Sequence, residues 1–148
     1  MEFKTTKKPI NIDTNSRILY LTIIVLFIMN YTGSGKEKNI SLLKIHLLLW
    51  AIQNPKRRKK LLKSVQNDCE ISIGFWNIEI RNNSILTFLL KDDLCGFNGK
   101  KYFLTEDGLS FIKNIKNLEI MKDEQEFLIC IGKKLTDKNV EKLKGLWS

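Results

Sequence analysis

The chain has 148 residues, of which 43% are hydrophobic and only 2 are proline, enough for one folded unit with a core of ordinary size. Its 25 basic and 16 acidic side chains give a net charge of +9, which indicates a polyanionic or acidic partner, although AT-biased coding also produces a lysine-rich composition. Three widely spaced cysteines and one histidine fit no familiar zinc spacing, so we expect free thiols, no metal and no other cofactor.

The N-terminal region is expected to be a flexible arm over residues 1–15, followed by a helix from Ser16 to about Tyr31. Residues 18–29 are nearly all apolar, but a helix of that length extends about 18 Å, well short of the roughly 30 Å hydrocarbon layer. No signal-peptide cleavage motif follows. We therefore predict a helix buried on nearly all sides, in a cytoplasmic protein that makes no membrane contact.

Two further helices are predicted next, SLLKIHLLLWAI beginning at Ser41 and PKRRKKLLKSVQ beginning at Pro55. Proline suits the first turn of a helix, where its missing N–H loses no hydrogen bond. The second of these helices carries six basic residues and no acid, which are Lys56, Arg57, Arg58, Lys59, Lys60 and Lys63. Such a helix either neutralises phosphates without reading sequence or is a solvated face, and the sequence supports both interpretations equally.

No residue pattern in the chain forms a catalytic site. Gly33-Ser34-Gly35-Lys36 lacks the first glycine and the final Ser or Thr of a phosphate-binding loop. The lone His46 lies among apolar residues of a predicted helix, where packing explains it better than general-base chemistry. The adjacent acids Asp92-Asp93 and Glu106-Asp107 point in different directions and form no dyad. We therefore predict that the protein is not an enzyme.

Residues 69–80 are the least regular part of the chain, and ISIGF (71–75) fits either a short strand or an extended connector. Asn82 or Asn83 then opens a helix that runs to Leu94. Its predicted core face consists of Ile85, Leu86, Leu89 and Leu90.

The segment LCGFNGKKYFLTEDGLSFIKNI predicts a β-hairpin followed directly by a helix. Asn98-Gly99 fits a two-residue type I′ turn, and residues 102–104 form the returning strand. Thr105 is expected to cap the helix, with acids in its first turn. The predicted apolar face of this helix is Leu109, Phe111, Ile112 and Ile115, and Lys100 and Lys101 lie on the hairpin.

Together these elements predict a mainly α fold, with a winged helix-turn-helix core, one β-hairpin wing, and additional N- and C-terminal helices. We place the winged-helix domain at residues 16–118 and a C-terminal helical extension at residues 119–148, with helices from Asp123 to Leu135 and from Asp137 to Leu146. In DNA-reading winged helices the helix before the wing enters the major groove. Here Asp92 and Asp93 nearly cancel the cations of that helix, which favours protein contacts.

Four segments together resemble one family: SRILYLTIIVLF, ISLLKIHLLLWAI, LCGFNGKKYFLTEDGLSFI and EFLICIGKKLTDKNVEKL. They are similar to the winged-helix middle component of bacterial ABC-three-component anti-phage defence systems, the group that includes Lamassu, and the similarity spans Ser16 to Leu143. This chain differs from the family around residues 75–80, where a proline-containing connector is common. The resemblance implies a non-enzymatic subunit that joins an SMC-like, DNA-sensing ATPase to an effector such as a nuclease and restrains it. ATP and metal would belong to the partners.

Under this interpretation the candidate partner-interface residues are Ile18, Leu19, Ile23, Phe27 and Trp50. The basic helix and the two hairpin lysines are candidates for non-specific DNA contact or for an acidic partner surface. The alternative function is a winged-helix transcriptional regulator that binds DNA through those same cations. A small secreted protein is a third, remote alternative.

Overall fold

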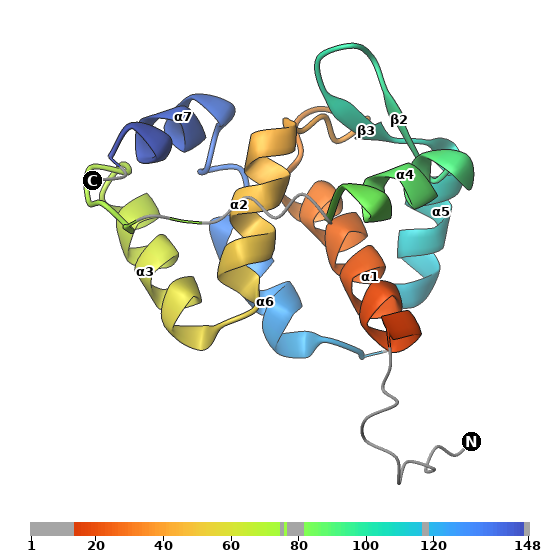
Figure 1. The fold of residues 1–148 in the computed structure, drawn as a ribbon, viewed down its shortest axis with the longest axis horizontal. Helices are drawn as coiled ribbons and strands as arrows, with labels where there is room; N and C mark the ends of the chain where they lie inside the picture. The colour runs from red at the N-terminus through yellow and green to blue at the C-terminus, as the bar shows by residue number, and fades with distance from the viewer. Residues whose placement is uncertain (1–13, 75, 77–81, 117–118, 147–148) are drawn as a thin grey trace, which may run out of the picture.

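The computed structural model describes residues 14–74, 76, 82–116 and 119–146, and the predicted arm lies mostly outside them. Over these residues the fold is mainly helical with one two-stranded antiparallel sheet, as predicted (Figure 1). The helices are α1 (Thr14–Thr32), α2 (Leu42–Ile52), α3 (Pro55–Gln66), α4 (Asn83–Lys91), α5 (Glu106–Ile115), α6 (Lys122–Ile131) and α7 (Asp137–Gly145), and the strands are β2 (Cys95–Phe97) and β3 (Tyr102–Leu104).

Helix α1 forms the centre of the core, as its uninterrupted apolar sequence predicted. Residues 24–29 are completely buried, because α2, α4, α5 and α6 pack around this helix. Burial of each large aliphatic side chain contributes about 1.5–3 kcal/mol, so α1 is a large source of hydrophobic stabilisation. No helix in the described ranges is long and apolar enough to cross a membrane.

Helices α2 and α3 form where the sequence predicted, and each begins after a polar residue that caps it. The hydroxyl of Ser41 accepts the N–H of Lys44 at 3.2 Å. The side chain of Asn54 accepts the N–H groups of Lys56 and Arg57, with Pro55 in the first turn. Each cap satisfies N–H groups that have no partner within the helix.

The hairpin forms where predicted, but its turn is not the predicted one. The N–H of Asn98 donates to the carbonyl of Lys101 at 3.1 Å, so the turn is centred on Gly99 and Lys100. Within it only Gly99 has a positive φ, of 96°. The cause is the side chain of Asn98, whose Oδ1 accepts the N–H groups of Lys100 and Lys101 at 3.0 and 2.9 Å. An Asx-type turn of this kind competes with type I′ geometry.

The end of α4 and the start of α5 meet at a closely packed corner. Thr105 caps α5 by accepting the N–H of Gly108 at 3.0 Å, and its Oγ1 donates to the carbonyl of Asp93 at 2.5 Å. A Cβ on Gly108 would overlap the carbonyl oxygen of Leu94. The first turn of α5 therefore lies directly against the last residues that follow α4.

Helices α6 and α7 share the core with the rest of the protein. Helix α6 packs on α1 and α3, and α7 packs on α2. The predicted end of α6 at Leu135 is wrong, because Gly132 takes a positive φ of 50° and stops the helix at Ile131. Thr136 then caps α7 by accepting the N–H of Asn139. The buried side chains of this region are Phe127, Leu128, Ile131, Leu135, Val140 and Leu143.

Two other sequence predictions can be compared with the described residues. Residues 71–74 form an extended connector rather than a strand, and Phe75 and residues 77–81 lie outside the described ranges. On α5, Ile112 and Ile115 are buried, but Phe111 is 37% exposed and does not belong to the core face. Positions 108, 112 and 115 form the inward face at helical spacing, which turns position 111 outward.

Candidate interaction surfaces

Two of the six basic residues on α3 support the fold rather than line a free surface. Arg57 donates from Nη1 to the carbonyl of Trp50 at 3.1 Å, and its guanidinium lies 4.8 Å from the Trp50 ring. Arg58 donates from Nε to the carbonyl of Ile52 at 2.9 Å. These carbonyls lie at the C-terminal end of α2, where they lack helical partners and where the helix dipole favours cations. Both arginines therefore act as a C-terminal cap for α2.

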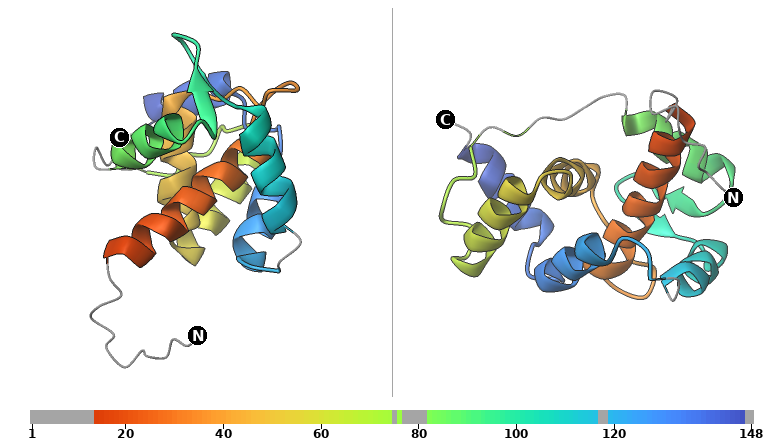
Figure 2. Two further views of the ribbon diagram at one scale, coloured as in Figure 1. Left: turned by 90° about the vertical axis from the view of Figure 1, so that its right-hand side faces the viewer. Right: turned by 90° about the horizontal axis from the view of Figure 1, so that it is seen from below.

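The remaining basic candidates are separated in space. All four lysines of α3 are exposed: Lys56, Lys59, Lys60 and Lys63. On the hairpin Lys100 is exposed, while Lys101 forms an ion pair with Asp137 at 2.6 Å. Helix α3 and the hairpin lie at opposite ends of the molecule (Figures 1 and 2). The structure therefore does not join the two predicted basic groups into one surface.

The five interface candidates fall into three environments. Ile18 and Leu19, at the start of α1, are 40% and 60% exposed. Ile23 and Trp50 are half-buried, and Trp50 lies under Arg57. Phe27 is completely buried in the core and contacts Tyr31, so it offers no surface to a partner, contrary to our prediction. Position 27 points inward because α1 is enclosed along its central turns.

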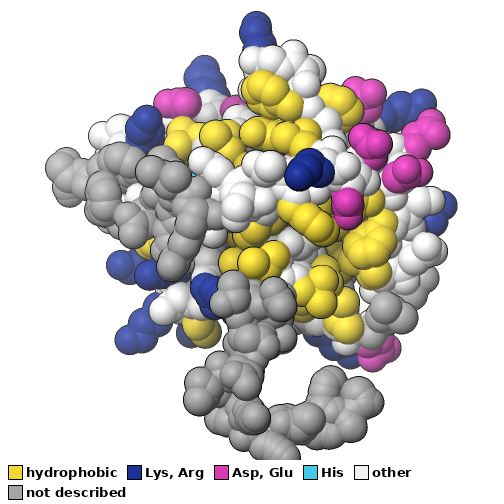
Figure 3. All heavy atoms as spheres, turned by 45° about the vertical axis from the view of Figure 1, so that its right-hand side comes forward, with side chains coloured by type: hydrophobic (Ala, Val, Ile, Leu, Met, Phe, Trp, Pro, Cys, Tyr) yellow, Lys and Arg dark blue, Asp and Glu magenta, His cyan; other side chains and the backbone are white. Residues whose placement is uncertain are grey.

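Three exposed phenylalanines lie on neighbouring elements, and the sequence analysis did not predict them as surface residues. Phe88 on α4 is 46% exposed, Phe97 on β2 is 50% exposed, and Phe111 lies on the neighbouring α5. Figure 3 shows hydrophobic side chains spread across the side of the molecule formed by these elements and α1. We call Phe88, Phe97 and Phe111 the aromatic face. Phe88 could have been found from the sequence, because it falls outside the helical spacing of the buried α4 residues.

Four carboxylates border the aromatic face at the corner between α4 and α5. Asp92 and Asp93 follow α4, and Glu106 and Asp107 form the first turn of α5. The contacts of Thr105 with Asp93 and Gly108 hold these two segments together. Among the described residues no ion pair neutralises any of the four. We call them the acidic corner; Figure 3 shows acidic side chains gathered along one side of the hydrophobic area.

A buried lysine lies in the first turn of α2. Lys44 donates from Nζ to the carbonyl of Thr32 at 2.8 Å. Burial lowers its pKa to about 8, with Asp137 opposing that shift and Lys101 and Lys133 adding to it. Asp137 also accepts from the hydroxyl of Ser41 at 2.8 Å, and its pKa is lowered by these hydrogen-bonding and cationic neighbours despite partial burial. This network joins the start of α2 to the start of α7.

The described part of the chain contains no group of three or more His, Cys, Asp and Glu side chains that could hold a metal ion. Its one histidine, His46, is buried and has Nε2 3.1 Å from Oδ1 of Asn83. All three cysteines are unpaired, two of them buried. Comparisons with protein-family models, with curated proteins and with solved structures found no match for this chain.

Proposed function

We propose that this protein is a non-catalytic assembly and regulatory subunit that links an SMC-like ATPase to an effector in a cytoplasmic anti-phage or anti-plasmid defence complex. The resemblance to the middle component of ABC-three-component systems suggests the class of complex. The residue order of α4, hairpin and α5 suits a winged helix, with the hairpin as its wing. The proposal assigns ATP hydrolysis and effector chemistry to the partners.

The aromatic face with its acidic corner is the observation that carries this proposal. In a winged helix, α4 holds the position of the groove-reading helix. Here its outward side presents Phe88 and ends in Asp92 and Asp93, which would repel DNA phosphates. Exposed aromatic side chains in a polar rim are typical of protein–protein contact sites. The chemistry of this surface therefore favours a protein partner over a DNA groove.

Co-expression with the products of the neighbouring genes tests the proposal. We expect a stable complex in size-exclusion chromatography that contains this chain, a coiled-coil ATPase and an effector. The purified chain alone should show no ATPase or nuclease activity. A chain that elutes as a monomer in the presence of both neighbours would contradict the proposal.

A second candidate function is a winged-helix DNA-binding transcriptional regulator, and the four exposed α3 lysines favour it. Charge reversal of Arg57 or Arg58 would test it poorly, because both residues cap α2. The variant Lys59→Glu/Lys60→Glu/Lys63→Glu changes exposed side chains only. A regulator should lose promoter binding and repression in this variant, whereas an assembly subunit should retain its partners.

A further inference from the structure

Lysines from three separate elements gather on the side of the molecule opposite α4. Lys38 lies in the loop after α1, Lys116 follows α5, and Lys133 follows α6. Figure 2 shows this loop beside α5 and α6, with α4 on the far side of α1. Partial burial lowers the pKa of Lys38, and the charges of Lys133 and Lys116 lower it further, so Lys38 interacts with both ammonium groups. Within the described ranges none of them forms an ion pair with a carboxylate.

The position of Lys38 is set by a well-anchored loop. Ser34 and Asn39 exchange two backbone hydrogen bonds of 2.8 Å, and Ile40 exchanges two of 2.9 Å with Tyr102 on the hairpin. Lys38 itself has a positive φ of 58°, which is uncommon for a residue with a side chain. A Cβ on Gly33 would lie 2.6 Å from the Lys38 carbonyl group, so the two backbones are in close contact. The fold therefore holds Lys38 near other cations rather than letting it move away.

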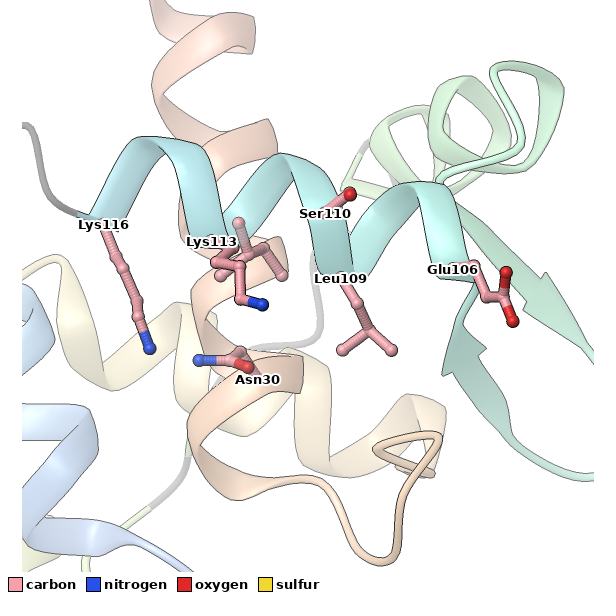
Figure 4. A pocket seen from close by; sticks show the side chains of 7 residues that line it. Asn30, Glu106, Leu109, Ser110, Lys113 and Lys116 are labelled. Carbon is pink, nitrogen blue, oxygen red and sulfur yellow. The ribbon is translucent and has the colours of Figure 1, made fainter.

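A cavity of about 380 Å³ opens between α1 and α5, and Lys113 and Lys116 are among the residues that line it. Figure 4 shows Lys113 and Lys116 extending from α5 toward the side where Asn30 of α1 lies. Glu106 lies at the opposite end of the cavity. Two ammonium groups and an amide therefore meet at the end away from the carboxylate. Lysine and amide donors of this kind suit the oxygen atoms of phosphate.

A second cavity of about 680 Å³ lies on the hairpin side of the same loop. It is lined by Ser34, Gly35, Asn39, Asn98, Lys100 and Lys101. Lys101 is already neutralised by Asp137, so Lys100 supplies the free charge there. Lysines that line two separate cavities, with Lys38 on the loop after α1, suit a ligand with several phosphates in a row. The backbone of a nucleic acid has that spacing of charge, and a compact acidic side chain does not.

We propose that Lys38, Lys113, Lys116 and Lys133, with Asn30, form a phosphate-binding site that contacts a nucleic-acid backbone without reading its bases. The site lies on the opposite side from α4 and away from α3. It therefore differs from DNA-groove binding by α4 and from phosphate contact by the basic residues of α3, the two modes that the sequence analysis considered. It does not rest on the proposed assembly function, because the isolated full chain is sufficient to test it. Repulsion among the lysines is relieved when phosphate binds, which supplies part of the affinity.

The test measures fluorescence anisotropy of a labelled DNA duplex of about 20 base pairs across a range of salt concentrations. The site variant is Lys38→Gln/Lys116→Gln/Lys133→Gln, and the matched control is Lys56→Gln/Lys59→Gln/Lys63→Gln, which removes three charges from α3. We expect the site variant to weaken binding at least about tenfold and to reduce the salt slope by about 3, with the control within about threefold of wild type. Thermal melts with inorganic phosphate and pyrophosphate separate the two sources of phosphate.

Stabilisation by phosphate or pyrophosphate that the site variant loses supports a site for discrete phosphates. Binding of the duplex without such stabilisation supports a backbone contact along both cavities. Equal losses in the site and control variants would overturn the proposal, because general charge would then explain binding. Binding of poly-glutamate as tightly as DNA at equal salt, or no DNA binding by wild type at low salt, would also overturn it. Circular dichroism of each variant confirms that it remains folded.

Discussion

The side of the molecule at α4 and the side at the loop after α1 have opposite chemistry. At α4, exposed phenylalanines lie beside four carboxylates that no described lysine or arginine neutralises. On the other side, Lys38 interacts with Lys116 and Lys133 from two other parts of the chain, and Lys116 also lines a cavity. The net charge of +9 does not reveal this difference, because it sums the whole chain and the acidic corner is only a small part of it. The charged residues of this chain therefore suggest binding partners only once their positions in the fold are known.

This separation suits a protein that binds two unlike partners at once. An apolar surface with acids at its edge complements a protein segment that carries apolar and basic residues. A lysine-rich cavity complements phosphate. The two sides meet on α5, where Glu106 belongs to the acidic corner and also lines the cavity that contains Lys113 and Lys116.

The largest effect is expected from Gly108→Ala, which would disrupt the α4 side alone. The new methyl group would overlap the carbonyl of Leu94 and force α5 away from the end of α4. We expect the free energy of unfolding to fall by about 3 kcal/mol in urea denaturation. Ser110→Ala, on the exposed side of the same helix, is the control and should change stability little. Similar stability for both variants would show that the corner is less tightly packed than described.

Raising the pH should remove the charge of the buried Lys44 in the folded protein before it does so in the unfolded chain. Burial lowers the pKa of Lys44 from 10.5 to about 8. Between these two pH values Lys44 is protonated in the unfolded chain and largely neutral in the folded protein. The free energy of unfolding should therefore rise across this window, by about 3 kcal/mol relative to Lys44→Met. The comparison with Lys44→Met is needed because burial also raises the pKa of Cys95 from 9.0 to about 11. Between these values the Cys95 thiol lowers the free energy of unfolding as the pH rises, which is opposite to the effect of Lys44. Parallel pH profiles for wild type and variant would contradict the account.

Phe88→Ala should weaken protein partner binding by about 2 kcal/mol, or roughly 30-fold, if the aromatic face contains an interface hot spot. Isothermal titration of the folded variant with the purified partner measures this change. Ile129→Ala is the control, because Ile129 is also an exposed apolar residue but lies on α6. A loss with Ile129→Ala and none with Phe88→Ala would move the interface away from α4.

The smallest effect is expected when a basic residue that stabilises the fold is compared with one that is exposed to solvent. Arg57→Ala removes a hydrogen bond to Trp50 and a cation–π contact, so we expect a loss of about 1 kcal/mol in stability. Lys59→Ala, two residues away in the same basic run, should change stability by less than about 0.5 kcal/mol. Chemical denaturation of both variants compares them directly. Equal values would mean that Arg57 is as solvated as the lysines.

Local signals explain why the sequence predicted most of the elements correctly. Ser41, Asn54, Thr105 and Thr136 precede their helices, and each accepts an N–H from the first turn. The continuous apolar run of α1 correctly indicated a central buried helix. Capping and hydrophobic periodicity act within a few residues, so they can be read without knowledge of the fold. The winged-helix assignment remains a prediction.

The parts that were missed depend on contacts between distant residues or on competition within a turn. The capping roles of Arg57 and Arg58 require the end of α2 beside them, and the convergence of Lys38, Lys116 and Lys133 requires three elements to meet. The hairpin turn differs from the predicted one because the side chain of Asn98 accepts hydrogen bonds from the N–H groups of Lys100 and Lys101. No sequence periodicity reports such contacts, so the candidate surfaces emerged only from the fold.

Hydrogen exchange of the chain in complex with the coiled-coil ATPase or effector tests the central claim most directly, because it maps the contact on the native protein. The account predicts slower exchange in α4, β2 and the first turn of α5, while α3 and the loop after α1 keep the exchange rates of the free chain. Protection confined to α3 and that loop, with α4 unchanged, would contradict the assignment of the aromatic face as the protein-binding surface.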